Sequence, residues 1–172
     1  MSGIGRERGT GETQRPRVAH LRSVLAPTDF SEDGNHALGY AYALAPEGGT
    51  VHLLHVVEEQ DLPNPLYAHY TPGRRPSREE RAAQQGDLEQ ALAALVPAEA
   101  RARGIATKVS IAQDDDPAGA ILREAERLGV DAICMGASGR SGLSRTLAGS
   151  VASKVASENA CPLVLVRRPR EE

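Results

Sequence analysis

The residues best suited to chemistry in this sequence form one stretch rich in glycine and hydroxyl groups, from Gly136 to Val151. Glycine allows a ligand to approach the main chain closely, and the first N–H groups of a helix bind anions. Arg140 and Arg145 add positive charge to the same stretch. The pattern therefore predicts a site for a phosphate-bearing ligand. The stretch contains these glycines and hydroxyl residues: Gly136, Ser138, Gly139, Ser141, Gly142, Ser144, Thr146, Gly149 and Ser150.

Two elements must position this stretch: a strand predicted over 131–135 before it, and a helix predicted to start near Gly149 and Ser150 after it. The spacing differs from the two common phosphate motifs, since neither GxxxxGK[ST] nor GxGxxG occurs. From spacing alone, a surface turn that needs glycine only for its geometry remains the alternative.

Apolar runs and helix signals alternate along the rest of the chain. Ser31, the Ser77–Glu80 pair and Asp116-Pro117 are typical helix starts, while Pro46, Pro97 and Gly129 are typical interruptions or ends. Strand–helix alternation predicts an α/β fold of Rossmann-like type, an open five-stranded parallel sheet with helices on both faces. The strands are predicted over 21–27, 50–57, 106–112, 131–135 and 163–166.

Composition limits the class of protein. The chain has 172 residues, 40% hydrophobic content, 3% aromatic content and a net charge of −3. We expect a disordered tail over 1–18 and a single domain over 19–170, with an aliphatic core. Weak charge argues against a nucleic-acid partner, and no apolar stretch approaches the roughly 20 residues that span a bilayer. With no signal-like start, the expected location is the cytoplasm.

The remaining polar and sulfur-containing residues favour structural roles. Cys134 and Cys161 lie in or beside predicted strands and have no metal-type spacing. His52 and His55 differ by three positions in a strand, which predicts opposite faces. The acidic run 114–116 is interpreted as a solvated helix start, with a cation site as the alternative. The proline-rich segment 58–76 is a long loop, either mobile or functional.

The glycine stretch resembles the signature of the universal stress protein family, G-x2-G-x9-G-[ST]. Gly136, Gly139, Gly149 and Ser150 match it in full, and Val151 follows as in members that bind ATP. The segments Val24–Ser31, Leu53–Val56 and Cys161–Val166 resemble the family's first, second and last strands, so that the likeness covers residues 20–168. Ser138 departs from it, because many members carry His or Arg there.

The resemblance implies a strand order of 3-2-1-4-5 and a site for ATP, with or without Mg²⁺. It places Asp29 and Gly136 at the ends of neighbouring strands, where open α/β sheets bind ligands. The residues that it implies for nucleotide binding are Pro27, Thr28, Asp29, Val56, Gly136, Gly139, Arg140, Gly149, Ser150 and Val151. Three alternatives stay open: a local turn or cap for Asp29, core packing for Val56, and a helix cap for Ser150.

The predicted function is that of a cytoplasmic stress-response regulator that binds ATP. The intact signature favours binding, and no nucleophile–base pair is evident that would favour an enzyme. The alternatives are a slow ATPase or phosphotransferase and an interaction module that does not use nucleotide. An aliphatic last strand at the sheet edge, together with the resemblance, also predicts a homodimer through that strand.

Overall fold

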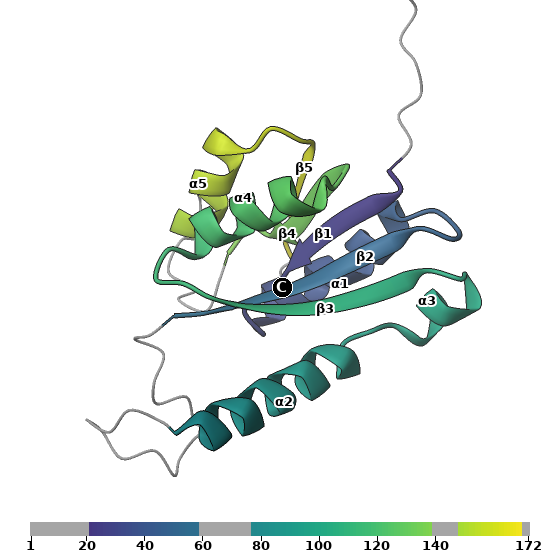
Figure 1. Cartoon of the computed structure of the whole chain (residues 1–172). Helices are drawn as coiled ribbons and strands as arrows, with labels where there is room; N and C mark the ends of the chain where they lie inside the picture. The colour runs from purple at the N-terminus through teal and green to yellow at the C-terminus, as the bar shows by residue number, and fades with distance from the viewer. Residues whose placement is uncertain (1–20, 59–76, 139–147, 170–172) are drawn as a thin grey trace, which may run out of the picture.

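The computed structural model describes residues 21–58, 77–138 and 148–169, which form alternating strands and helices (Figure 1). The predicted tail over 1–18 and most of the predicted loop over 58–76 lie outside the described residues. The elements are β1 (Ser23–Pro27), α1 (Glu32–Leu44), β2 (Thr50–Val57), α2 (Arg78–Ala94), α3 (Ala98–Ala102), β3 (Ala106–Gln113), α4 (Pro117–Leu128), β4 (Ala132–Gly136), α5 (Ser150–Glu158) and β5 (Leu163–Val166).

The five strands form one parallel sheet in the order β3-β2-β1-β4-β5. This confirms the predicted α/β class and the order 3-2-1-4-5. From β1 the chain adds β2 and then β3 on one side of the sheet. It then crosses to the other side of β1, where it forms β4 and β5. The connections after β1 and β4 therefore leave the sheet in opposite directions, which opens a crevice between the carboxyl ends of these strands.

Strand residues alternate between two aliphatic cores, one on each face of the sheet. Val24 and Ala26 point to the face covered by α1, α2 and α3, whereas Leu25 points to the face covered by α4 and α5. Figure 1 shows α4 and α5 on one side of the sheet, α1 on the other, and α2 running along β3. The predicted helices on both faces are therefore present, and the cores are almost free of aromatic side chains.

Most predicted helix boundaries are confirmed by their hydrogen bonds. Ser31 Oγ accepts the Gly34 N–H at 3.0 Å at the start of α1. Ser77 and Glu80 form the predicted capping box at the start of α2. Asp116 caps α4 by accepting the Gly119 N–H at 3.1 Å, and Gly129 ends that helix in the left-handed conformation, with φ of 59°.

Strand boundaries differ from the prediction by one or two residues: β3 ends at Gln113 rather than at residue 112, and β4 covers Ala132–Gly136 rather than 131–135. The first strand begins at Ser23 rather than at residue 21. The Asp131 side chain accepts the N–H groups of Arg22 and Ser23, while the Arg22 carbonyl accepts the Thr50 N–H of β2 at 2.8 Å. The predicted interruption at Pro97 is confirmed, because the chain restarts there as the five-residue helix α3, whose Ala100 packs into the core beside α1.

Candidate functional site

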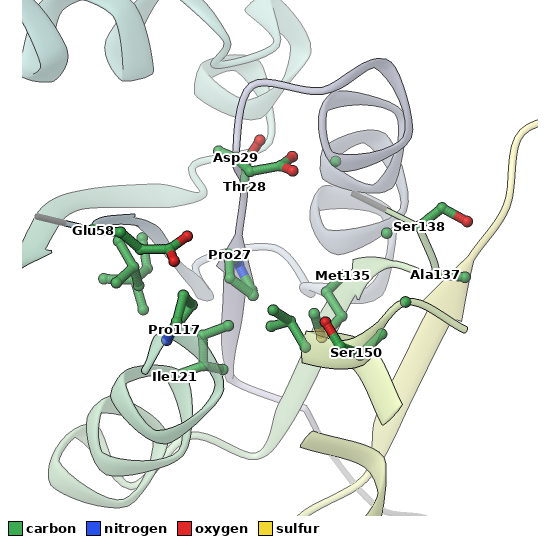
Figure 2. Close-up of a pocket in the computed structure, with 17 residues that line it drawn as sticks. Pro27, Thr28, Asp29, Glu58, Pro117, Ile121, Met135, Ala137, Ser138 and Ser150 are labelled. Carbon is green, nitrogen blue, oxygen red and sulfur yellow. The ribbon is translucent and has the colours of Figure 1, made fainter. Parts of the chain in front are cut away.

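A cavity of about 400 Å³ opens at the carboxyl ends of β1, β2 and β4, where α4 and α5 begin (Figure 2). This is the crevice that the strand order creates, and its size suits a small organic ligand. Its wall is formed by Pro27, Thr28, Asp29, Gly34, Leu54, Val56, Glu58, Pro117, Ile121, Met135, Gly136, Ala137, Ser138, Gly149, Ser150, Val151 and Ala152.

The turn after β1 carries Asp29 to the mouth of this cavity. Asp29 Oδ1 accepts the Ser31 N–H at 3.0 Å, and Thr28 Oγ1 accepts the Phe30 N–H at 3.1 Å. The predicted alternative for Asp29, a local side-chain turn, is therefore present, while Ser31 rather than Asp29 caps α1. Asp29 nevertheless lines the cavity, so the local turn does not exclude the predicted role in binding.

Gly136 ends β4 directly against the first turn of α1. A Cβ atom at this position would lie 2.9 Å from the Asp33 carbonyl carbon and oxygen and 3.0 Å from the Gly34 nitrogen. Such distances are too short for a real side chain, and the neighbours are backbone atoms that cannot rotate away. Gly136 is therefore required for packing β4 against α1, in addition to any role in admitting a ligand.

The start of α5 supplies main-chain donors to the cavity. Gly149 is its N-cap, and no side chain among the described residues caps this helix. The Gly149 N–H already donates to Ala137 O at 2.8 Å, so the next amides, beginning with Ser150, are the orphan donors that every helix start carries. Because Ser150 is the first helical residue, the alternative that it serves only as the cap is wrong.

Much of the remaining wall is apolar. Leu54 and Val56 project from β2, Ile121 from α4 and Met135 from β4, and all four also belong to the core under α4 and α5 or pack against it. Val56 therefore both packs and lines the cavity, so its two predicted roles are again compatible. Figure 2 shows Ile121 and Pro117 on one side of the cavity and Ser150 beside Met135 on the other.

The structure brings together eight of the ten residues that the sequence indicated. Pro27, Thr28, Asp29 and Val56 come from the strand ends, and Gly136, Gly149, Ser150 and Val151 come from β4 and α5. Gly139 and Arg140 lie outside the described residues, as do the other residues from 139 to 147.

Sequence reasoning missed several residues of the wall. Pro117 and Ile121 were interpreted only as helix start and buried stripe, because the sequence does not show that α4 begins over the cavity. Glu58 was included only in the proline-rich loop, yet its carboxylate points toward the cavity in Figure 2. Its position two residues after Val56, directly past the end of β2, was the available signal, since alternate residues of an extended chain share a face.

A smaller hollow adjoins the cavity beside α4 and α5 and includes Asp116 and Lys154. Lys154 Nζ donates to Asp116 Oδ2 at 2.7 Å, which lowers the pKa of the Asp116 carboxyl and raises that of the Lys154 ammonium. Both side chains are well exposed, so this ion pair contributes little to stability. It links the starts of the two helices that flank the cavity, and the acidic run is a helix start as predicted.

Two kinds of feature are absent from the described residues. These residues contain no group of three or more His, Cys, Asp or Glu placed to hold a metal ion. They also include no helix with the length and apolar character needed to cross a bilayer. His52 and His55 are both buried and point to opposite faces of the sheet, as their spacing predicted.

Comparisons with known proteins agree with this architecture. A family model described as "Universal stress protein family" matches residues 20–167. Over 56 residues the chain is 43% identical to universal stress protein MJ0531 of Methanocaldococcus jannaschii, a segment covering 33% of each protein. The chain therefore spans about a third of the length of that curated relative.

Solved structures resemble the chain over most of its length. The structure of hypothetical protein MJ0577 superposes with a TM-score of 0.70 and 27% identity, covering 89% of this chain and all of the other. A universal stress protein in complex with cAMP gives 0.57 and 19%, covering 86% and 98%. One from Archaeoglobus fulgidus in complex with dAMP gives 0.52 and 17%, with the same coverage.

Proposed function

The chain belongs to the universal stress protein family, and from this premise we propose that it binds an adenine nucleotide, ATP, in the cavity between β1 and β4. We further propose that nucleotide binding regulates the protein in a cytoplasmic stress response. One observation supports the proposal most directly. The same cavity is lined by an apolar surface and by the start of α5, which no side chain among the described residues caps.

The two halves of the wall suit the two ends of a nucleotide. Val56, Pro117 and Ile121 offer an apolar surface for a planar base. On the opposite side, the first amides of α5 and the positive end of its helix dipole favour phosphate. Pro27, Thr28 and Asp29 lie between these regions at the end of β1, where a ribose would sit.

Charge decides which contacts must hold the phosphates. Among the described residues, the ionisable side chains of the cavity wall are the carboxyl groups of Asp29 and Glu58, with no Lys or Arg. Phosphate binding would therefore rest on main-chain N–H groups, on Ser150, and on Arg140 of the signature. Mg²⁺ would be held mainly by phosphate oxygens and water, since the described residues provide no ligand cluster of their own.

Two structural neighbours support the choice of an adenine nucleotide. The proteins solved with cAMP and with dAMP share this fold and bind nucleotides that contain adenine. The family signature favours ATP over a monophosphate for this chain, because Gly149 and Ser150 of the signature begin α5, whose first amides would be available to a polyphosphate.

Mass spectrometry of nucleotide released from the purified protein, followed by calorimetric titration with ATP and AMP, tests the proposal. A protein that carries no adenine nucleotide and takes up neither ligand would refute it. Binding of AMP and ATP with equal affinity would restrict the proposal to the nucleoside and its first phosphate.

A matched pair of variants at Ser150 tests the contribution of the α5 amides. Proline is favoured at the first helical position, and Gly149 already has the extended conformation that a following proline requires, with φ of −58° and ψ of 164°. Ser150→Pro therefore removes one N–H donor while keeping the helix, whereas Ser150→Ala removes only the hydroxyl.

We expect Ser150→Pro to bind ATP about tenfold or more weakly than Ser150→Ala, because hydrogen bonds to charged groups are strong. Adenosine, which lacks phosphate, should bind both variants equally. Equal ATP affinity of the two variants would contradict phosphate binding at the start of α5. ATP turnover that is lost in Ser150→Pro would instead favour the ATPase alternative.

We also propose that two copies pair through β5, which is an edge strand of the sheet. Leu165 is 37% exposed, and Leu163 and Val164 are only half-buried, so this aliphatic edge invites pairing with a second copy. Sedimentation at micromolar concentration should show a dimer, and Leu165→Lys should shift it toward the monomer. A monomeric wild-type protein would refute this proposal.

A further inference from the structure

The turn that carries Asp29 contains an unusual backbone conformation. Phe30 has φ of 62°, and it is the only residue other than glycine with positive φ in the described parts of the chain. This left-handed region is unfavourable for a bulky residue, so the surrounding contacts must hold it there. The strain lies one residue after Asp29, at the mouth of the proposed nucleotide site.

The buried side chain of His55 contacts this turn from β2. His55 Nδ1 lies 2.8 Å from the Thr28 carbonyl oxygen, and because a carbonyl only accepts, Nδ1 must carry the proton that it donates. The His55 ring also packs on the Phe30 ring, with centroids 4.7 Å apart and planes inclined by 58°. One side chain thus holds both the start and the strained residue of the turn.

His55 cannot act by touching the ligand, because it faces away from the cavity. Its neighbours Leu54 and Val56 line the cavity, and alternate strand residues share a face, so His55 projects to the α1 side of the sheet. The Thr28 N–H donates to Leu54 O at 2.9 Å, which ties the same turn to β2 through the main chain.

We propose that His55 is a positioning residue, whose Nδ1–H bond to Thr28 O and contact with Phe30 hold the strained turn 28–31 so that Asp29 faces the nucleotide. The inference rests on the proposed function, since positioning has a consequence only if the cavity binds a nucleotide. It assigns the site a supporting residue on the opposite face of the sheet.

Substitutions at two histidines of the same strand separate this role from plain core packing. His55→Leu removes the donor and the ring, whereas His55→Asn keeps a donor nitrogen at the same bond distance from the backbone as Nδ1. His52→Leu is the matched control, because His52 is equally buried, at 7% exposure against 8%, and faces the other side of β2.

We expect His55→Leu to weaken ATP binding about five- to tenfold in calorimetric titration, as loss of one buried hydrogen bond would do. His55→Asn should recover most of that loss, and His52→Leu should bind within about twofold of wild type. Equal affinity of His55→Leu and wild type, no recovery in His55→Asn, or an equal loss in His52→Leu would overturn the inference.

A double-mutant cycle tests whether His55 acts through Asp29. Asp29→Asn keeps an oxygen for the Ser31 N–H but removes the charge that faces the ligand. If His55 works by orienting Asp29, His55→Leu should add less than about twofold to the loss already caused by Asp29→Asn. Independent, multiplied losses would contradict the inference.

Amide exchange of Phe30 and Ser31 in the ligand-free protein provides a readout that does not depend on nucleotide. Exchange should accelerate in His55→Leu and return toward the wild-type rate in His55→Asn. Unchanged exchange would overturn the positioning role even if ATP binds. Accelerated exchange in a protein that binds no nucleotide would instead refute the proposed function and remove the role of His55 in binding.

Discussion

Replacing Gly136 by alanine should destabilise the protein even when no ligand is present. The added Cβ would lie 2.9 Å from the carbonyl of Asp33, inside any normal contact distance, and the clashing atoms belong to the first turn of α1. Relief therefore requires α1 to move relative to β4, because no flexible side chain can give way. Gly136→Ala tests this packing with the smallest possible side chain.

The cost follows from what overpacking does in well-packed cores, which is about 1–3 kcal/mol. For a domain of this size, each kcal/mol corresponds to about 2–4 °C in Tm. Urea unfolding of the ligand-free protein, followed by circular dichroism, measures the free energy directly. Gly39→Ala is the matched control, because its Cβ would meet nothing within 4 Å in the middle of α1.

Gly39→Ala should stabilise the protein by about 0.5–1 kcal/mol, since glycine is unfavourable inside a helix. If Gly136→Ala unfolds at the same urea concentration as wild type, then β4 and α1 do not approach each other as described, and the reasoning fails. If Gly136→Ala is destabilised as expected, a Gly136 variant can lose nucleotide binding because its fold is disturbed. Such a loss would then not by itself show that a contact with the ligand is missing.

Three further predictions concern the cap, the pH dependence and the thiols. Ser31→Ala should lower the free energy of unfolding by about 1 kcal/mol in urea titration, because it removes the α1 cap, whereas Ser31→Thr should keep most of it. Burial, reinforced by Lys108, lowers the pKa of His52 from its ordinary 6.5. The folded state thus disfavours protonation, and Tm should fall as the pH drops below about 6.5, with a flatter profile in His52→Leu; an unchanged profile would contradict this assignment. Burial raises the pKa of the Cys134 thiol to about 11, so a thiol reagent at pH 8 should modify the half-exposed Cys161 first and Cys134 only on unfolding; early modification of Cys134 would contradict its burial.

Local signals predicted most of the elements because each depends on a few neighbouring residues. The capping box of Ser77 and Glu80, the Asp116-Pro117 start and the left-handed Gly129 all act within one helical turn. The strands Thr50–Val57 and Leu163–Val166 match their predicted bounds because each is a run rich in aliphatic residues that starts directly after a glycine or a proline. Alternation alone then implied the parallel sheet.

The candidate site was partly accessible from the sequence because its residues follow strands at the points where parallel strands end. The start of α5 was predicted from Gly149 and Ser150, and the placement of Asp29 and Gly136 at the ends of neighbouring strands followed from the implied strand order. Pro117, Ile121 and Glu58 were missed as wall residues, because the tilt and position of α4 over the sheet depend on contacts between distant segments.

The sequence by itself determined the element types, their caps and the glycine signature, because these depend on neighbours along the chain. Only the tertiary structure decided why Gly136 must be glycine and why Phe30 has a left-handed backbone. The first depends on how closely α1 packs against β4, and the second on a buried histidine from another strand. Both are contacts between segments that the chain brings together only when the sheet forms.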